Sequence, residues 1–403
     1  MEKKLVLFGA GKIGRSFIGQ LFSRGGYEVV FVDVFKPLID EINRRHEYSV
    51  VIKAKHESII EVKNVRGVYS GDENAVIAEI SNAAIVATAV GQNGLPGIFP
   101  LLAKGIIKRQ EKNSGLPIDI IIAENLMNAA QYFYAELSKF LPAGFPANQI
   151  AGLVETSIGK MVPLMSQSDM KNDMLQVFAE EYNTLVLDKK AFKNPIPQIE
   201  GLAPKENIKA WIDTKFFIHT LGHATAAYLG FIYNQELIYL HDVLDVPELK
   251  YEVRETMLQS AAALIKRYPE EFSFEMMQEH IGDLLLRFQN RALGDTIYRV
   301  GCDLKRKLGS NDRISGAIKL ARDMDLPYDK MLKALVCGCH FRATSENGKI
   351  FPGDIEFAEI YESGIRNVLT RICGFDEKKD KQLIEQAEKM DKEIAGFSIK
   401  LKQ

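Results

Sequence analysis

Three basic side chains with helical spacing form the strongest chemical candidate in the sequence. Lys215, His219 and His223 follow one another at intervals of four within an otherwise apolar run. Each residue of an α-helix turns by about 100°, so the three fall on one face and Thr220 lies at its flank. A lysine among aromatic neighbours loses hydration, which lowers its pKa and suits it to act as a general base. The alternative is an amphipathic helix whose basic edge only faces water.

The same histidine spacing is compatible with a zinc site, so metal binding has to be weighed against base chemistry. The glutamate that completes a His-Glu-x-x-His motif does not follow His219. Cys337, Cys339 and His340 form a second group of soft ligands, but free cysteines commonly pack as small apolar residues. We therefore predict no metal site, and we expect His219 to line a pocket or to pack in the core.

Length and composition restrict the classes of protein to which the chain can belong. A chain of 403 residues exceeds one ordinary core, which predicts two domains. A net charge of −2 does not favour nucleic acid or an anionic membrane as a partner. No apolar run reaches the roughly 18 residues of a membrane span. Four cysteines do not form a disulfide framework, which favours a reducing, cytoplasmic environment.

The first 33 residues have the pattern of a dinucleotide-binding unit. Residues 5–8 read as a buried strand and are followed by Gly9, Ala10, Gly11, Lys12, Ile13 and Gly14. A helical period begins at Ile13, and a second strand over 28–32 ends at Asp33. Strand, glycine-rich turn, helix, strand and acid in about 30 residues is the context that the dinucleotide fingerprint requires.

Each residue of this fingerprint has its own physical task. Gly9 permits the tight turn, Gly11 lets the backbone approach a pyrophosphate, and Gly14 lets the helix pack on the strand. The helix N-terminus offers N–H groups to the phosphates. Asp33 is placed to accept from a ribose 2′-OH and repels a 2′-phosphate, so we predict NAD rather than NADP. Lys36 is a nearby cation that would instead favour a 2′-phosphate and therefore NADP.

Strands and helices continue to alternate to about residue 193. We predict a helix over 36–45, an extended pair over 49–53 and 59–68, and buried strands over 83–91 and 118–123. Residues 149–154 are expected to be the last strand of the sheet, and 177–187 to be extended. Val90, Gly91 and Asn125 follow buried strands, where ligands bind in parallel sheets.

The segment 193–197 contains two prolines and is the most linker-like part of the chain. We therefore predict an α/β organisation: a Rossmann-type doubly wound domain with added strands over 1–193, and a mainly α-helical domain over 194–403. Helical periods are expected at 209–229, 235–242, 248–266, 274–288, 296–304, 313–324, 329–339, 357–373 and 378–394. The last of these is charged and offers no apolar interface, which favours a monomer.

Motifs along nearly the whole chain resemble the polyol-specific long-chain dehydrogenases. The resemblance covers the glycine-rich opening, Thr88-Ala89-Val90-Gly91, Ala123-Glu124-Asn125 and the stretch from Leu221 to Gly230. Three further motifs resemble the mannitol-1-phosphate 5-dehydrogenase branch of that family: Arg287-Phe288-Gln289-Asn290, Arg299-Val300-Gly301 and His340-Phe341-Arg342. The C-terminal motifs in this order are much more specific than the glycine pattern alone.

The resemblance implies a two-domain, NAD-dependent enzyme without catalytic zinc. By the same resemblance Lys215 is the general base and His223 orients the substrate and the lysine. Asn125 matches an asparagine that holds the developing alkoxide, but the family's second asparagine is replaced by Thr220. Gly159-Lys160 also stands where the family usually has Asp-Arg. Both departures bear on the substrate and the rate rather than on the fold.

These observations predict an oxidoreductase that interconverts a polyol phosphate and a ketose phosphate, of the mannitol 1-phosphate and fructose 6-phosphate type. A sugar phosphate needs cationic donors, and arginine suits a bidentate grip. Candidates for contact with the substrate are Lys160, His219, Arg299, Lys307, His340 and Arg342. Two alternatives stay open: a relative acting on a hexuronate or unphosphorylated polyol, and a nucleotide-binding relative with impaired catalysis.

Overall fold

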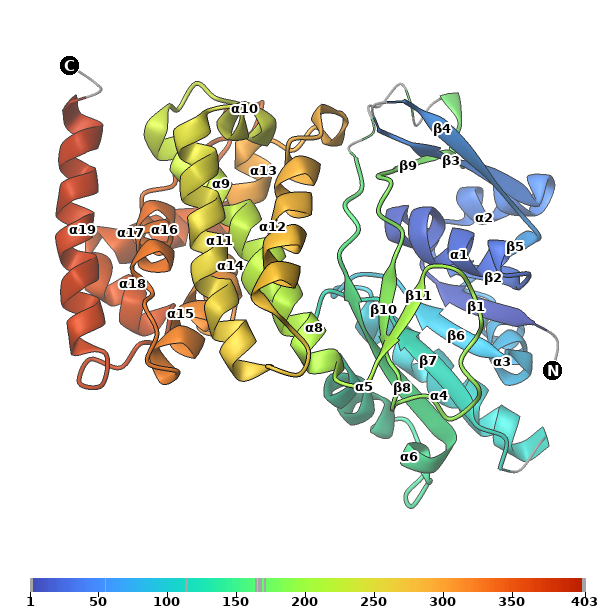
Figure 1. Cartoon of the computed structure of the whole chain (residues 1–403). Helices are drawn as coiled ribbons and strands as arrows, with labels where there is room; N and C mark the ends of the chain where they lie inside the picture. Colours follow the sequence, from blue (N-terminus) through green and yellow to red (C-terminus); the bar gives the residue numbers. More distant parts are fainter. Residues whose placement is uncertain are drawn as a thin grey trace. The chain divides into compact units, whose positions relative to one another are not determined.

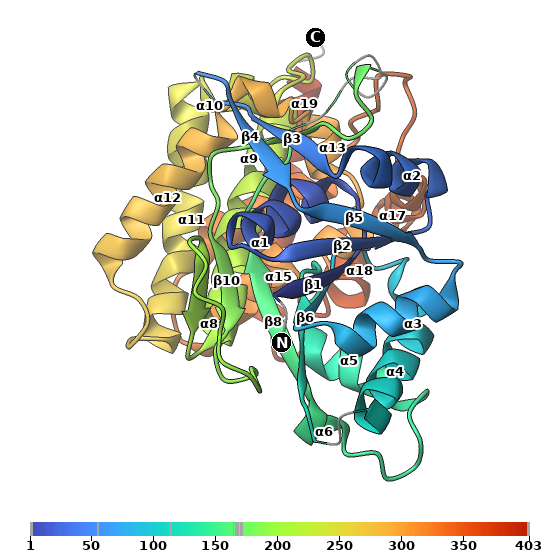
Figure 2. The same cartoon turned by 90° about the vertical axis from the view of Figure 1, so that its right-hand side faces the viewer.

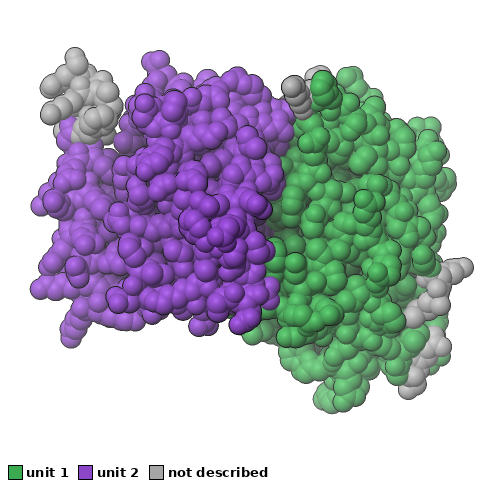
Figure 3. Space-filling model, in the orientation of Figure 1, with its two compact units in different colours: residues 1–212 green, residues 213–403 purple. Residues whose placement is uncertain are grey.

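The computed structural model describes residues 3–400, except 55, 113–114, 164, 166–168 and 170–171. The chain forms two compact units, residues 1–212 and 213–403, which Figure 3 colours separately. The proline-containing segment over 193–197 predicted this division after residue 193. It falls later because β11 (Leu202–Lys205) pairs with β10 (Leu185–Asp188) and so belongs with the first unit.

The first unit is built on an eight-stranded sheet with the order β11-β10-β8-β7-β6-β1-β2-β5 (Figure 1). All neighbouring strands are parallel except β10, which runs antiparallel to β8. The remaining strands of this sheet are β1 (Lys4–Phe8), β2 (Glu28–Asp33), β5 (Val65–Tyr69), β6 (Ile85–Thr88), β7 (Ile118–Ile122) and β8 (Ala151–Ile158). This is the Rossmann-type sheet that the sequence predicted.

The central strands are apolar on both faces because helices cover both faces of the sheet. Leu5 and Leu7 pack with residues of η1, α1 and α2, whereas Val6 and Phe8 pack with α3, α4 and α5. Figure 2 shows α3, α4 and α5 gathered on one side. The helices of this unit are η1 (Gly14–Gly19), α1 (Gln20–Arg24), α2 (Lys36–Arg45), α3 (Glu73–Asn82), α4 (Leu95–Lys112), α5 (Ala129–Ser138) and α6 (Ala147–Ile150).

Three predictions about strands need correction. Residues 149–154 are not in the last strand of the sheet, because β10 and β11 extend it beyond β8. Residues 177–187 are not one segment: β9 (Val177–Ala179) joins a small second sheet, β4-β3-β9, and β10 joins the large one. In the small sheet β3 (Glu47–Ile52) and β4 (Ser58–Lys63) form the predicted extended pair, while β5, also within the predicted segment, pairs with β2 instead.

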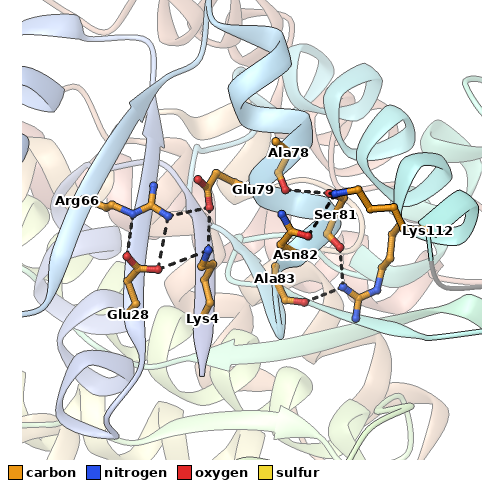
Figure 4. Close-up of polar contacts among 10 residues, drawn as sticks. Lys4, Glu28, Arg66, Ala78, Glu79, Ser81, Asn82, Ala83 and Lys112 are labelled. Carbon is orange, nitrogen blue, oxygen red and sulfur yellow. Dashed lines mark hydrogen bonds and ion pairs between the residues drawn. The ribbon is translucent and has the colours of Figure 1, made fainter. Parts of the chain in front are cut away.

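A network of charges joins the beginnings of β1, β2 and β5 to α3 (Figure 4). Arg66 binds Glu28 and Glu79 at 2.8 Å each, and Lys4 lies 3.3 Å from Glu79. Burial opposes the charge on Arg66, but its hydrogen bonds to the two carboxylates outweigh burial and raise its pKa. The network lies at the amino edge of the sheet, opposite the carboxyl edge where parallel sheets bind ligands.

The second unit consists of helices around the buried α9, which packs against α10, α11, α13 and α16. Two predicted helices are each divided in the structure. Residues 357–373 fall in α17 and α18, separated by Gly364 at φ +103°, and residues 296–304 fall in α13 and α14, separated by Asp303 at φ +72°. A left-handed residue ends a helix, and the sequence pattern alone does not reveal it at Asp303.

The helices from Ile208 onward are α8 (Ile208–Thr214), η2 (Lys215–Thr220), α9 (Leu221–Tyr233), α10 (Leu240–Leu244), α11 (Pro247–Arg267), α12 (Phe274–Phe288), η3 (Arg291–Leu293), α13 (Ile297–Gly301), α14 (Leu304–Lys307), α15 (Arg313–Asp323), α16 (Asp329–Cys339), α17 (Pro352–Glu362), α18 (Ile365–Arg371) and α19 (Lys381–Lys400). Within the described residues, no helix combines the length and apolar character needed to cross a membrane.

Candidate active site

The glycine-rich turn of the first unit has the shape that its sequence predicts. Gly9 has φ +96°, and a Cβ there would collide with the Ala89 carbonyl of the next strand. A Cβ on Gly14 would collide with the carbonyl of Gly9, so helix and strand need a glycine at this position. Around Gly11, by contrast, a Cβ would meet nothing within 4 Å. The turn therefore leaves open the place at which a pyrophosphate would approach the backbone.

Asp33 fixes the turn from the end of β2. One oxygen accepts from Ala10 N–H at 2.7 Å and the other from Phe35 N–H at 2.9 Å. An ionised carboxylate has about four acceptor positions, so these two bonds leave capacity for a ribose hydroxyl. Lys36, which argued for a 2′-phosphate, donates to Asp40 on its own helix at 2.7 Å. Lys36 thus leaves the negative charge of Asp33 in place, and this charge favours NAD over NADP.

Glu124 organises a second part of the carboxyl edge. It follows β7 and is 6% exposed, and it accepts from the N–H groups of Val90 (2.8 Å) and Gly91 (2.9 Å). Burial raises the pKa of Glu124, and the two backbone bonds oppose this rise. The sequence showed Glu124 only as the residue before Asn125. Its role in holding the Val90-Gly91 loop depends on a contact across 33 residues, which no local pattern indicates.

The stretch from Lys215 to His223 is not a uniform α-helix, which corrects the predicted face. Lys215–Thr220 is a π-helix that continues into α9. Lys215, Thr220 and His223 are partly exposed, whereas Phe216 to His219 between them are buried. His219 therefore lies on the buried side, and Thr220 shares the exposed side with the lysine.

The π-helix is the physical reason for this change of face. In an α-helix a residue five positions further along is turned by about 500°, and so it lies about 140° away from the starting residue. Hydrogen bonds that span five residues rather than four reduce the turn at each residue. Thr220 is five residues beyond Lys215, so the π-helix brings it back toward the face of the lysine.

Lys215 has the electrostatic setting expected of a basic amine. Burial removes hydration from the ammonium group and the positive charge of Arg313 opposes it, which lowers the pKa of Lys215 from 10.5 to about 8. Its Nζ lies 5.7 Å from the centre of the Phe216 ring. The aromatic neighbour and the lowered pKa agree with the expectation from sequence.

His223 is held by a residue that the sequence did not reveal. Its Nε2 and Asp295 Oδ2 are 2.9 Å apart, and its ring stacks on Phe288 with centroids 4.8 Å apart and an interplanar angle of 22°. Asp295 is 4% exposed and also forms an ion pair with Arg299. Because a carboxylate only accepts, the neutral ring carries its proton on Nε2, and Nδ1 is the acceptor nitrogen. Asp295 therefore bridges His223 and Arg299, and Arg299 is one of the predicted substrate contacts.

Thr220 directs its hydroxyl into its own helix. Oγ1 donates to the Phe216 carbonyl at 2.7 Å. A hydroxyl has one proton to donate. Thr220 can stabilise an alkoxide only after that proton turns away from Phe216.

His219 has the core position that was one of its two predicted settings. It is 8% exposed and its ring lies 5.5 Å from that of Phe288. Burial, with Arg287 and other positive groups nearby, holds the pKa of His219 well below its usual value, so the ring is neutral. Among the described residues no group of three or more His, Cys, Asp or Glu side chains is arranged to hold a metal ion.

Lys160, a predicted substrate contact, is bonded within the first unit. Its ammonium group donates to Glu180 O (3.1 Å), Tyr182 O (2.7 Å) and Asn183 Oδ1 (3.1 Å). An ammonium group has three donors. These bonds give Lys160 a structural role at the end of β8, and we do not include it in the proposed site.

His340 and Arg342 connect α16 to the helices that follow it. His340 Nε2 lies 2.9 Å from Asp391 Oδ1 and 3.0 Å from the Tyr361 hydroxyl. Arg342 Nη1 donates to the carbonyls of Cys339 and Phe341 at 2.9 and 2.7 Å. The Arg342 guanidinium group also lies over the Tyr361 ring of α17, 5.3 Å from its centroid. Both side chains thus have partners within the second unit, which weakens their case as phosphate ligands.

Comparisons with known proteins agree with both units. Residues 3–201 match the family model described as the mannitol dehydrogenase Rossmann domain, and residues 207–393 match the mannitol dehydrogenase C-terminal domain. Mannitol-1-phosphate 5-dehydrogenases from two strains of Streptococcus pneumoniae are 31% identical over 386 and 387 residues, 95% of this chain and 98% of theirs.

A solved structure shares the fold over the whole chain. Pseudomonas fluorescens mannitol 2-dehydrogenase, in a ternary complex with NAD and D-mannitol, has a TM-score of 0.77, with 14% identity over 99% of this chain and 94% of that one. At this identity the likeness concerns the fold alone. The two family models and the relatives at 31% identity show that the chain belongs to the mannitol dehydrogenase family of oxidoreductases.

Proposed function

We propose that the protein is an NAD-dependent dehydrogenase that interconverts a polyol phosphate and a ketose phosphate, of the mannitol 1-phosphate and fructose 6-phosphate type. The observation that carries the proposal is the partly exposed face of Lys215, Thr220 and His223, with an amine of lowered pKa, in a member of this family. The names of the Streptococcus pneumoniae relatives support the phosphorylated substrate.

The first unit supplies residues that fit a dinucleotide. The open backbone at Gly11 and the N–H groups that follow it would receive the pyrophosphate, and Asp33 would receive the adenosine ribose. Val90 and Gly91, held by Glu124, would line the same carboxyl edge. When bound, NAD supplies the hydride acceptor, while the protein supplies position and charge.

The second unit supplies the proton chemistry. Lys215 takes the proton of the reacting hydroxyl, and a pKa near 8 leaves a useful fraction of neutral amine at physiological pH. His223 accepts a hydrogen bond at Nδ1 from the substrate, with its ring orientation fixed by Asp295 and Phe288. Thr220 assists the developing alkoxide once its hydroxyl has turned. Asn125, which belongs to the first unit, keeps the role in holding the alkoxide that the family resemblance implies.

A substrate panel tests the proposal directly. Purified protein is assayed with NAD and NADP against mannitol 1-phosphate, other hexitol phosphates, mannitol and hexuronates, and NADH absorbance is recorded. The expected result is a kcat/KM highest for a hexitol phosphate with NAD. Preference for mannitol would instead favour an unphosphorylated polyol, the substrate class of the Pseudomonas fluorescens complex. Intact NADH binding without turnover of any compound would favour a catalytically impaired relative.

A further inference from the structure

A cluster of buried cations lies beside the catalytic stretch of the second unit. Arg313 is 6% exposed and Lys307 is 7% exposed, and neither has a role in the proton chemistry described above. Arg313 is the first residue of α15. That helix lies against η2: a Cβ on Gly316, one turn beyond Arg313, would come 2.8 Å from the Phe217 ring. Arg313 is therefore positioned by the helix that packs on the segment carrying Lys215.

The guanidinium group of Arg313 is only partly bonded. Its Nε donates to Asp312 Oδ1 at 2.7 Å. Across the described residues, neither η nitrogen has an acceptor. Lys307 is better satisfied, since its Nζ donates to the carbonyls of Val300 (2.7 Å) and Arg299 (3.4 Å). Burying an arginine whose η nitrogens have no acceptor costs free energy, unless a ligand binds those nitrogens.

Charges around Arg313 point to an anion as the missing partner. Burial is the main cause that lowers the pKa of Lys215 and of Lys307, and the next cause for both is the positive charge of Arg313. One guanidinium group thus repels two amines, each with a pKa of about 8. The strongest charged influence on either amine is repulsive, although carboxylates lie near.

Those carboxylates are already bonded elsewhere. Asp312 accepts from Arg313 N–H and Nε, and it caps α15. Asp303 pairs with Arg306. Asp354 accepts from the backbone N–H groups of Asp303 and Leu304. None of these bonds uses the η nitrogens of Arg313, which pairs with Asp312 through Nε alone.

We propose that Arg313, with Lys307, forms a phosphoryl-binding subsite that takes the phosphate monoester of the substrate. This rests on the proposed function, and it identifies the ligand of the phosphate group within that site. The two η nitrogens of a guanidinium group match two oxygens of a phosphate in a bidentate pair. The N-terminus of α15, an 11-residue helix, adds a favourable dipole at the same residue. Arg313 then determines the preference for a phosphorylated over an unphosphorylated polyol.

Direct binding of inorganic phosphate tests the subsite without any turnover. The full-length protein is titrated with phosphate by calorimetry, with NADH present to occupy the dinucleotide turn. We expect Arg313→Gln to weaken phosphate binding by roughly a hundredfold, because a buried charge-assisted pair is lost. Arg313→Lys keeps the positive charge but loses the bidentate guanidinium group. Its phosphate affinity should therefore lie between that of the wild type and that of Arg313→Gln. Arg322→Gln, at the other end of α15 and paired with Asp380 and Asp323, is the control and should bind as wild type.

Kinetics separate failure of the subsite from failure of the proposed function. If the subsite is correct, Arg313→Gln lowers the ratio of kcat/KM for the polyol phosphate to kcat/KM for the unphosphorylated polyol by roughly a hundredfold. An effect through Lys215, whose pKa Arg313 lowers, falls on both substrates alike and leaves this ratio unchanged. Unchanged phosphate affinity, or an equal loss on both substrates with an intact melting temperature, would overturn the subsite. Arg313-dependent phosphate binding in a protein that turns over no polyol phosphate would overturn the proposed function and leave the subsite standing. If Arg313→Gln does not fold, Arg313→Lys gives the same comparison.

Discussion

Replacing Lys215 by methionine should abolish turnover and at the same time stabilise the second unit. The ammonium group is penalised in the fold, because its pKa falls from 10.5 to about 8. At about 1.4 kcal/mol for each pH unit, this amounts to about 3.5 kcal/mol at most. Lys215 is only partly buried, and methionine also gives up whatever bonds the ammonium group makes. We therefore expect a gain of about 1–2 kcal/mol in the free energy of unfolding at pH 7.

The pH dependence of this gain has a definite sign. The unfolded chain holds the lysine proton up to about pH 10.5, whereas the fold releases it near pH 8. The penalty is thus fully present below pH 8, fades between pH 8 and 10.5, and is absent above that. The advantage of Lys215→Met over wild type should be largest at pH 7 and should disappear by about pH 10.5.

Urea unfolding at several pH values measures the difference in stability between Lys215→Met and wild type. Circular dichroism follows the helical second unit, and the fluorescence of Trp211 on α8 provides a second signal. Lys333→Met is the control, since that lysine is exposed and paired with Glu252, and it should change stability by less than about 0.5 kcal/mol. In parallel, kcat/KM of the wild type for the alcohol should increase about tenfold with each unit by which the pH is raised, up to about pH 8. A flat profile together with substantial activity in Lys215→Met would refute the assignment of the base.

Four further substitutions have expected outcomes. Asp295→Asn should lower kcat at least tenfold with NADH affinity unchanged, because His223 loses the group that orients it; a change below threefold, measured in steady-state kinetics, would contradict that role. Glu124→Gln should weaken NADH binding in a fluorescence titration, since one of two backbone N–H partners is lost, while kcat at saturating NADH stays within about threefold. Thr220→Asn should keep or raise kcat, and a loss above about tenfold would indicate a site rebuilt for another substrate. Asp119→Asn should reduce the free energy of unfolding by about 1–3 kcal/mol without affecting kcat, because the buried carboxylate accepts from Lys193 N and from Asn194 N and Nδ2.

Much of the fold follows from local patterns in the sequence. The glycine turn, β1, β2 and Asp33 are fixed by spacing, since each glycine has its own steric reason. The predicted helices over 274–288, 313–324 and 329–339 agree with α12, α15 and α16 within one residue at either end. These helices have strong apolar periodicity and ends that the sequence indicates, such as the Ser273 cap of α12.

The remaining features depend on contacts between distant residues. Asp295 lies 72 residues beyond His223, and its carboxylate contacts the ring only because α13 packs on α9. Lys160 and His340 stay predicted substrate contacts, but the sequence does not reveal the oxygens that each of them binds within the fold. In the fold, Lys160 binds oxygens about 20 residues further along, and His340 binds Asp391 on α19. Arg313 was not among the predicted substrate contacts, and its burial depends on the packing of α15 on η2.

The face of the catalytic helix is the clearest case in which the helical period misleads. A continuous α-helix would place Lys215, His219 and His223 on one face, with Thr220 only at its flank. The π-helix absorbs one extra residue before α9 begins, so the apolar residues of α9 keep their places in the core while Lys215 moves into phase with Thr220 and His223.

A second π-helix, Gly14–Gly19, begins at the last glycine of the dinucleotide turn. π-Helical turns are rare in proteins and concentrate at functional sites. In this chain one follows the residues proposed to hold the cofactor, and the other carries the residue proposed to take the proton. Because such a turn has weaker local support than an α-helix, its retention within two well-packed cores is best explained by the side chains that it aligns. The Lys-x₄-Thr-x₂-His spacing of this chain is therefore a spacing for a π-turn followed by an α-turn, and we propose that the three side chains act together in that geometry.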